Sequence, residues 1–130
     1  MLDGGLQLTM IEKAWSELGC RVVLPKELAH DFEKQGPIQT EYHDRRQFRR
    51  FHFRRRALLE RRDELLCVYT KDISRAGVVI LHAEQIFPCE HVVLFLLNGQ
   101  TLQAKVRRCR RLNASCYECG LRIVATSGSG

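Results

Sequence analysis

The segment VVLFLLNGQTLQAKVR, residues 92–107, carries the strongest indication of the fold. Asn98-Gly99 separates two apolar runs, and this pair is typical of a tight β-hairpin in which both turn residues take positive φ. The run before the pair is apolar on both faces, whereas the run after it alternates apolar and polar residues like a half-buried strand. We therefore predict a hairpin whose first strand is covered on both sides.

Strand-like patterns extend from this hairpin in both directions. We predict six strands, over residues 53–60, 65–73, 77–83, 91–97, 100–108 and 117–125. Short turns between successive strands favour antiparallel pairing, and closing the sheet on itself removes its exposed edges. The predicted fold class is mainly β: a small six-stranded antiparallel barrel with one or two short N-terminal helices.

The residues before the strands have a different pattern. Residues 6–18 are expected to form an amphipathic helix, with Gly19 as its C-terminal stop and Thr9 and Glu12 as a capping box. Its apolar face, which would anchor the helix on the barrel, consists of Leu8, Ile11, Trp15 and Leu18. We further expect a short strand over 20–24, a second helix over 26–34 that is broken at Gly36-Pro37, and an extended linker over 38–43.

Charge divides the chain of 130 residues into two unequal parts. Residues 1–43 carry four basic and seven acidic side chains, a net charge of −3, and residues 44–130 carry seventeen basic and eight acidic, a net charge of +9. The basic part should attract an anionic partner. We predict three segments: an N-terminal helical extension of unknown role (1–43), a barrel domain (44–125) and a flexible tail (126–130).

Composition also limits the location and the chemistry. The longest apolar run has the length of a strand, so no membrane span is expected, and the first residues lack the pattern of a signal peptide. A cytoplasmic location follows as an expectation, and the six cysteines are then interpreted as reduced thiols. The single Cys116-x-x-Cys119 pair, with Cys109 upstream, is too few ligands for a structural zinc site. We predict no bound metal or cofactor.

An arginine-rich segment precedes the first strand. Nine of the eighteen residues from Arg45 to Arg62 are arginine, and none is lysine. The planar guanidinium forms paired hydrogen bonds with phosphates and guanine edges, which the point charge of lysine does not. We call residues 44–51 the arginine arm.

A second motif follows at residues 72–77. The Asp72 carboxylate is suited to accept hydrogen bonds from the Watson–Crick edge of guanine, with the Ser74 hydroxyl beside it. Gly77 either takes positive φ or lets a ligand approach the backbone. An alternative is that Asp72 and Ser74 only form an Asx-type turn between strands.

The two motifs together, Arg46-x-x-x-Arg50 and Asp72-x-Ser74-x-x-Gly77, resemble those of the PilZ domain, the bacterial receptor module for cyclic di-GMP. Arg45, just before the first motif, fits the same pattern, and the resemblance covers roughly residues 44–125. It implies a six-stranded barrel and an arm that is flexible without ligand and wraps the ligand when bound. The implied ligand-binding residues are Arg45, Arg46, Arg50, Asp72, Ser74 and Gly77.

The predicted function is therefore a cyclic di-GMP receptor that signals to a partner protein or a neighbouring domain, with a homodimer left open. No Ser/His/Asp order, carboxylate pair or glycine-rich phosphate loop is present, so we predict that the protein is not an enzyme. Two alternatives remain: a basic barrel that binds nucleic acid, and an interaction module that works without a ligand. Nucleic-acid binding would depend steeply on salt and little on Asp72.

Overall fold

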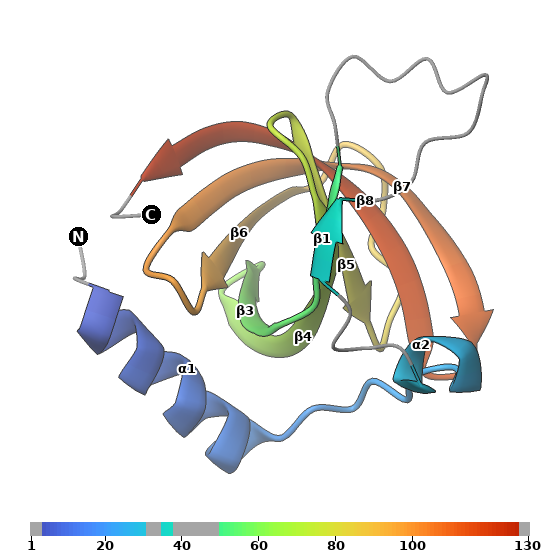
Figure 1. Cartoon of the computed structure of the whole chain (residues 1–130), viewed down its shortest axis with the longest axis horizontal. Coiled ribbons are helices and arrows are strands. Elements are labelled where there is room, and N and C mark those ends of the chain that lie inside the picture. Colours follow the sequence, from blue (N-terminus) through green and yellow to red (C-terminus); the bar gives the residue numbers. More distant parts are fainter. Residues whose placement is uncertain (1–3, 31–34, 38–49, 128–130) are drawn as a thin grey trace.

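The computed structural model describes residues 4–30, 35–37 and 50–127, and it consists mostly of strands. Figure 1 shows two helices at one side of a strongly curved sheet. In chain order the elements are α1 (Gly4–Leu18), α2 (Lys26–His30), β1 (Gln35–Pro37), β2 (Phe51–Phe53), β3 (Arg56–Arg61), β4 (Glu64–Ile73), β5 (Gly77–His82), β6 (His91–Leu96), β7 (Thr101–Asn113) and β8 (Cys116–Ser127).

Six of the strands close into a barrel. The antiparallel order is β4-β3-β6-β7-β8-β5, and β5 pairs back onto β4, so the ring is complete. This confirms the predicted fold class. The short strands β1 and β2 extend the sheet outside the ring: β2 pairs with the second half of β4, beyond the part that pairs with β3.

The predicted strand over residues 53–60 is two strands in the structure. β2 ends at Phe53 and β3 begins at Arg56. Between them the side chain of Thr70 on β4 accepts a hydrogen bond from the Arg55 backbone N–H at 3.1 Å, and the Thr70 N–H donates to the Arg55 carbonyl at 2.8 Å. A side chain thus replaces one backbone partner, which interrupts the regular ladder.

The barrel interior is filled by aliphatic side chains. On β7 the predicted alternation holds, because Leu102, Ala104 and Val106 are all buried in the core while Gln103 and Arg107 are exposed. Branched residues from every strand of the ring join them. The core cluster also contains Leu59, Val68, Val78, Ile80, Leu94, Leu96, Cys119 and Leu121.

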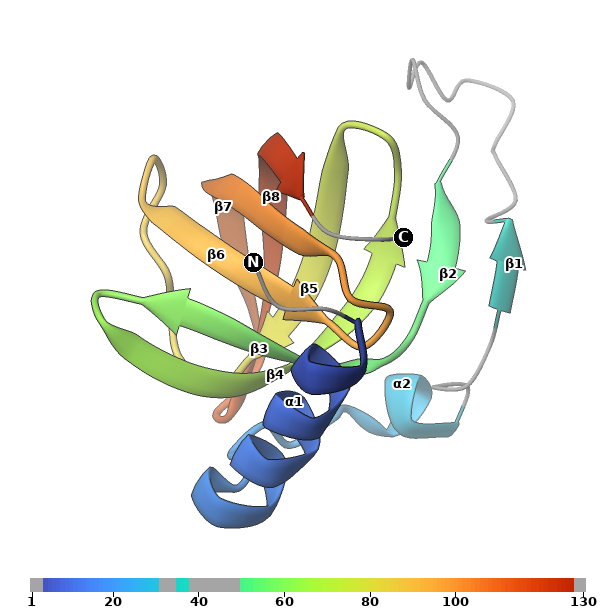
Figure 2. The same cartoon turned by 90° about the vertical axis from the view of Figure 1, so that its left-hand side faces the viewer.

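α1 packs on the outside of the barrel against β3, β4 and β6 (Figure 2). Ile11 meets Leu58 and Cys67 in a second apolar cluster, and Trp15 packs against it while its indole N–H donates to the Ala57 carbonyl at 3.0 Å. Buried Gln7 donates from Nε2 to the carbonyl of Leu96 at 2.7 Å. The predicted anchoring role of Trp15 and the covering of the doubly apolar β6 are confirmed.

The apolar face of α1 is narrower than predicted. Leu8 and Leu18 are 38% and 59% exposed, so neither belongs to the buried stripe. The Thr9–Glu12 capping box is wrong, because the helix already begins at Gly4. Gly19 does end the helix: its φ is +75°, and its N–H donates to the Trp15 carbonyl at 3.2 Å.

The segment after α1 also differs from the prediction. Residues 20–24 form no strand; instead Val23 is held in an extended path by Ser115 and Asn113, through an N–H···O contact of 3.0 Å and a side-chain contact of 2.9 Å. α2 is described only to His30. Gly36 and Pro37, predicted as a break, belong to β1. The predicted linker over 38–43 lies outside the described residues.

The tight turn with two positive φ values lies at Arg62-Asp63 and not at Asn98-Gly99. Gly99 has a φ of +93°, but Asn98 is not among the residues with positive φ, and four residues separate β6 from β7. Arg62 (φ +51°) and Asp63 (φ +66°) instead form the two-residue connection between β3 and β4. The prediction for Asn98 is therefore wrong, although the hairpin itself is confirmed.

This turn leads to a stability prediction. Replacing Arg62-Asp63 by Asn-Gly should raise the free energy of unfolding by about 1 kcal/mol, because these residues adopt left-handed φ at lower cost. Urea denaturation would measure it. Arg62→Ala is the control, since it removes only the side chain and its ion pair with Glu90. A decrease in stability for the Asn-Gly variant would contradict the assignment of the turn.

At the C-terminal end β8 continues to Ser127, so Thr126 and Ser127, predicted as tail, pair with Leu102 and Thr101. Among the described residues, neither helix is long and apolar enough to cross a membrane.

Candidate ligand-binding site

The turn between β4 and β5 is held by the side chain of Ser74. Its Oγ accepts hydrogen bonds from the N–H groups of Gly77 at 3.1 Å and Ala76 at 3.3 Å, and the Ser74 N–H donates to the Gly77 carbonyl at 2.8 Å. The alternative interpretation, that Asp72 and Ser74 form a turn between strands, is therefore confirmed for Ser74. The Asp72 side chain makes none of these turn hydrogen bonds with the described residues; its contact is with Arg50.

Gly77 is required by the closure of the barrel. Its φ is not positive, and a Cβ atom added there would lie 2.8 Å from the backbone oxygen of Leu121 on β8. No real Cβ contact is that short, and a backbone atom of a paired strand cannot easily move. Positive φ at Gly77 is therefore wrong. The close approach found there is made by β8, and the approach of a ligand stays a prediction.

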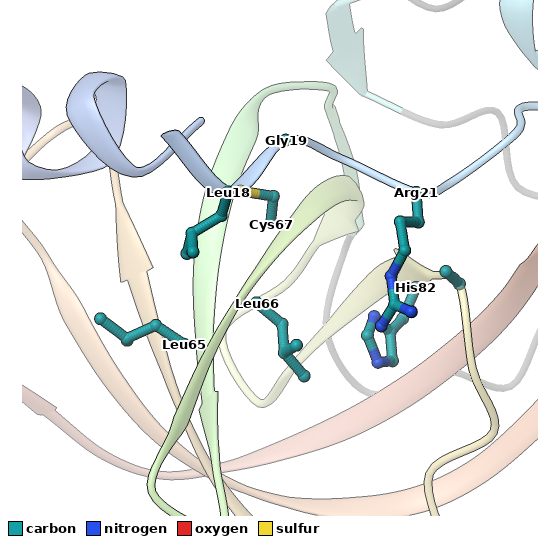
Figure 3. A pocket seen from close by; sticks show the side chains of 8 residues that line it. Leu18, Gly19, Arg21, Leu65, Leu66, Cys67 and His82 are labelled. Atoms are coloured by element: carbon teal, nitrogen blue, oxygen red, sulfur yellow. The ribbon is translucent and has the colours of Figure 1, made fainter. Parts of the chain in front are cut away.

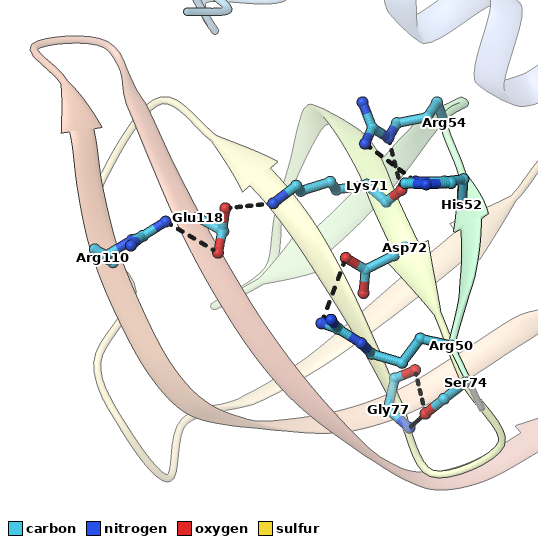
Figure 4. Close-up of polar contacts among 9 residues, drawn as sticks. All are labelled: Arg50, His52, Arg54, Lys71, Asp72, Ser74, Gly77, Arg110 and Glu118. Carbon is cyan, nitrogen blue, oxygen red and sulfur yellow. Dashed lines mark hydrogen bonds and ion pairs between the residues drawn. The ribbon is translucent and has the colours of Figure 1, made fainter. Parts of the chain in front are cut away.

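Asp72 presents a buried carboxylate at the second half of β4. It lies opposite His52 on β2 and Val79 on β5, and the residue is only 4% exposed. Arg50 Nη1 lies 3.9 Å from Asp72 Oδ2, a long ion pair (Figure 4). Burial raises the pKa of Asp72, and the charges of Arg50 and Lys71 oppose this effect.

This carboxylate is incompletely satisfied. Among the described residues the long ion pair with Arg50 is the only polar contact of the Asp72 side chain. A charged oxygen that loses water on burial is stable only when it gains hydrogen bonds in exchange. The arrangement therefore has the capacity to accept N–H groups from a ligand.

A second acid on β8 is held beside it. Glu118 accepts from Lys71 Nζ at 2.8 Å and lies 3.6 Å from Arg110 Nη2. Burial would raise the pKa of Glu118, but the hydrogen bond from Lys71 and the nearby arginines outweigh it, and the pKa is lowered. Glu118 thus stays ionised and fixes Lys71 and Arg110 over the barrel wall.

The outer face of β5, β8 and β7 extends the site with cations. Strand register pairs Gly77 with Arg122 and Arg122 with Lys105. In the next row Gly120 is paired with Arg108, whose Cγ would lie 3.5 Å from a Cβ at position 120. The side chain of Arg108 therefore lies across the glycine. This face offers an anion several guanidinium groups close to one buried carboxylate.

The structure brings four of the predicted site residues together: Arg50, Asp72, Ser74 and Gly77 gather around the β4–β5 turn (Figure 4). Arg45 and Arg46 lie outside the described residues, so their placement stays a prediction.

Sequence reasoning did not single out Lys71, Glu118 and Arg110 as a connected group. Lys71 is adjacent to Asp72 in the sequence, and strict alternation would place the two on opposite faces of β4. A bulge between Thr70 and Asp72 shifts the register there, so that Asp72 pairs with Val79.

The cysteines are all free thiols. Cys109 faces Cys119 across β7 and β8, with their Sγ atoms 3.0 Å apart, and Cys116 pairs with Asn113. The Cys116-x-x-Cys119 spacing therefore does not bring those two side chains to one site, since register pairs each with a different partner. Within the described part of the chain no three His, Cys, Asp or Glu side chains form a group that could hold a metal ion.

Comparison with known proteins identifies the class. The family model for the PilZ domain matches residues 44–129, and the chain belongs to that family. Among solved structures, the fold resembles that of the Bacillus subtilis inhibitor of motility (MotI/DgrA), with a TM-score of 0.52 and 17% sequence identity. The match covers 65% of this chain and 44% of that one, so this chain corresponds to less than half of that protein. No curated protein matches the chain.

Proposed function

We propose that this protein is a receptor for cyclic di-GMP, the ligand for which PilZ domains are receptor modules. The observation that carries the proposal is the buried Asp72 carboxylate, whose only described partner is a cation at 3.9 Å. It stands next to the Ser74–Gly77 turn of the family motif. The two carboxylate oxygens, of which one has only the long contact with Arg50, match the two N–H groups on the Watson–Crick edge of guanine.

The surrounding charges suit the rest of this ligand. Cyclic di-GMP carries two phosphodiester groups and two guanines, and arginine forms paired bonds with phosphates and with the O6/N7 edge of guanine. Arg50 is close enough to exchange its long contact with Asp72 for a ligand phosphate. Arg108 and Arg122 on the outer face raise the local potential, which speeds capture of a dianion.

Signalling would follow from the arginine arm. A ligand shifts a conformational equilibrium only by binding one state better than the other, and the arm contributes Arg45, Arg46 and Arg50 to one of those states. The acidic segment before the arm is joined directly to it, so we propose that this segment transmits the change to a partner protein or a neighbouring domain. Ligand should then alter hydrogen exchange within residues 30–50; unchanged exchange there would contradict this route.

The principal test is a calorimetric titration of cyclic di-GMP at physiological salt. Saturable binding that GTP does not displace is expected. Arg50→Ala should weaken binding about 30-fold, equivalent to about 2 kcal/mol, because it removes a charged hydrogen-bond donor. Arg107→Ala is the control: it removes one arginine as well, an exposed one on β7, and should change affinity less than threefold.

A second variant, Asp72→Asn, distinguishes a cyclic di-GMP receptor from a protein that binds nucleic acid. Asp72→Asn should weaken cyclic di-GMP binding at least tenfold, since an amide presents an acceptor and a donor where guanine needs two acceptors. Binding to a single-stranded RNA, which depends on phosphate contacts, should not weaken in the same variant. Absence of saturable cyclic di-GMP binding, with salt-dependent RNA binding, would favour the alternative. We propose no enzymatic turnover and no cofactor.

A further inference from the structure

A hollow of about 230 Å³ lies on another part of the barrel, where the end of α1 crosses the first half of β4 and the end of β5 (Figure 3). It exists because β4 pairs with β5 only from Tyr69 onward, so the two strands separate before that point. The residues that line it are Leu18, Gly19, Arg21, Leu65, Leu66, Cys67, His82 and Ala83. None of them belongs to the Arg50–Asp72 site.

His82 is the polar group in the wall of this hollow. The residue is 2% exposed, and neither Nδ1 nor Nε2 has a hydrogen-bond partner among the described residues. Burial lowers the pKa of His82 to about 4, so the ring is neutral near pH 7 and offers one donor and one acceptor. A buried polar group without a partner is destabilising, which indicates that something else satisfies it.

The mouth of the hollow combines a cation with apolar side chains. Arg21 uses one N–H group in its 3.1 Å contact with Glu84, and its side chain is 69% exposed, so further donors of the guanidinium are available. Leu18 and Leu65 stand at the opening with 59% and 39% exposure. Figure 3 shows the side chains of Arg21 and His82 on one side and those of Leu65 and Leu66 on the other.

We propose that this hollow binds a small monocarboxylate with a short aliphatic chain. The carboxylate would accept hydrogen bonds from Arg21 and from the N–H of His82, and the chain would lie against Leu18, Leu65 and Leu66. Guanidinium favours a planar carboxylate, with which it forms two parallel hydrogen bonds. Glu84 beside Arg21 disfavours a more highly charged anion such as a phosphate monoester.

Size and polarity limit the ligand further. A volume of about 230 Å³ corresponds to roughly seven or eight water molecules of liquid at about 30 Å³ each, enough for a six-carbon acid. A chain much longer would leave the leucine side chains and extend into solvent. Hexanoate is therefore a suitable probe. This proposal does not rest on the binding of cyclic di-GMP, because the two sites share no residue.

The test is an NMR titration of the full chain at pH 7 and constant ionic strength, following the ring signals of His82. Hexanoate should shift them saturably with a dissociation constant of about 1 mM, the range expected for so few atoms. Acetate has the charge without the chain and 1-hexanol has the chain without the charge. Each should bind at least tenfold more weakly than hexanoate.

A substitution of Arg21 provides the second part of the test. Because the Arg21 side chain is exposed, the substitution should leave the fold intact. Arg21→Gln should weaken hexanoate binding about tenfold, whereas Arg107→Gln on β7 should leave it unchanged. His82 signals that do not move up to 20 mM hexanoate, on the order of twenty times the expected constant, would overturn the proposal and leave a hollow that holds water. An equal response to acetate, or an unchanged affinity in Arg21→Gln, would overturn it as well.

Discussion

Gly77→Ala is expected to lower the free energy of unfolding by about 3 kcal/mol, at the upper end of the usual cost of overpacking. The added methyl carbon would lie 2.8 Å from the backbone oxygen of Leu121, so β5 and β8 must separate at the point where they pair. In a closed barrel that displacement has to be taken up by the neighbouring strands. Urea denaturation of both proteins, followed by circular dichroism, measures the difference.

Gly120→Ala is the matched control. Gly120 lies on β8, and a Cβ atom added there would have no backbone atom within 4 Å, apart from those of its chain neighbours. A Cβ there would meet only the Arg108 side chain, at 3.5 Å, and that side chain can move. Alanine also restricts the unfolded chain, so the change should be within about 1 kcal/mol of zero. Equal losses in the two variants would refute the close approach as the reason for glycine at position 77.

The second large effect is a loss of folding stability at low pH. Stability is expected to fall by about 3 kcal/mol between pH 6.5 and pH 4 through His82 alone. The pKa of this histidine is about 4 in the folded protein against an ordinary value of 6.5. As the pH falls below 6.5 the unfolded state takes up the proton first, so unfolding becomes favoured, and the loss is complete once the pH has passed the folded pKa.

His82→Leu isolates this contribution, because several carboxylates titrate in the same range. The variant should lose about 1.4 kcal/mol per pH unit less than the parent between pH 6 and pH 4.5. Replacing the exposed His91 by leucine provides the control for the loss of a histidine from the chain. Identical slopes in the His82 variant and the parent would contradict this prediction, because they would mean that His82 takes up its proton at the same pH in the folded and the unfolded state.

Much of the barrel follows from local sequence patterns. The six predicted strands correspond to β3–β8 within a few residues, since alternation and apolar runs report which side chains face inward. Errors occur where a residue's role depends on a distant neighbour. Asn98-Gly99 was assigned the turn with two positive φ values, yet Arg62-Asp63 adopts it, because the registers of β3 and β4 leave only those two residues to connect them.

The candidate site, too, was predicted in part from the sequence and in part depends on distant neighbours. Motif spacing was enough to select Arg50, Asp72, Ser74 and Gly77, and all four lie at one turn. Spacing did not reveal that the Asp72 side chain would have only the long contact with Arg50 within the described part of the chain, or that Lys71 would reach Glu118 on β8. Those features depend on the bulge in β4 and on the order of strands around the ring.

By itself the sequence therefore determined which segments form the strands of the barrel, the resemblance to the PilZ family and most of the motif residues at the candidate site. Each of these is encoded within a few neighbouring residues. Only the tertiary structure decided why Gly77 is glycine and which groups surround Asp72. It also decided that His82 is buried beside a hollow with no hydrogen-bond partner among the described residues. The physical reason is that burial and close approach are set by strands paired across the barrel, whose residues are tens of positions apart in the chain.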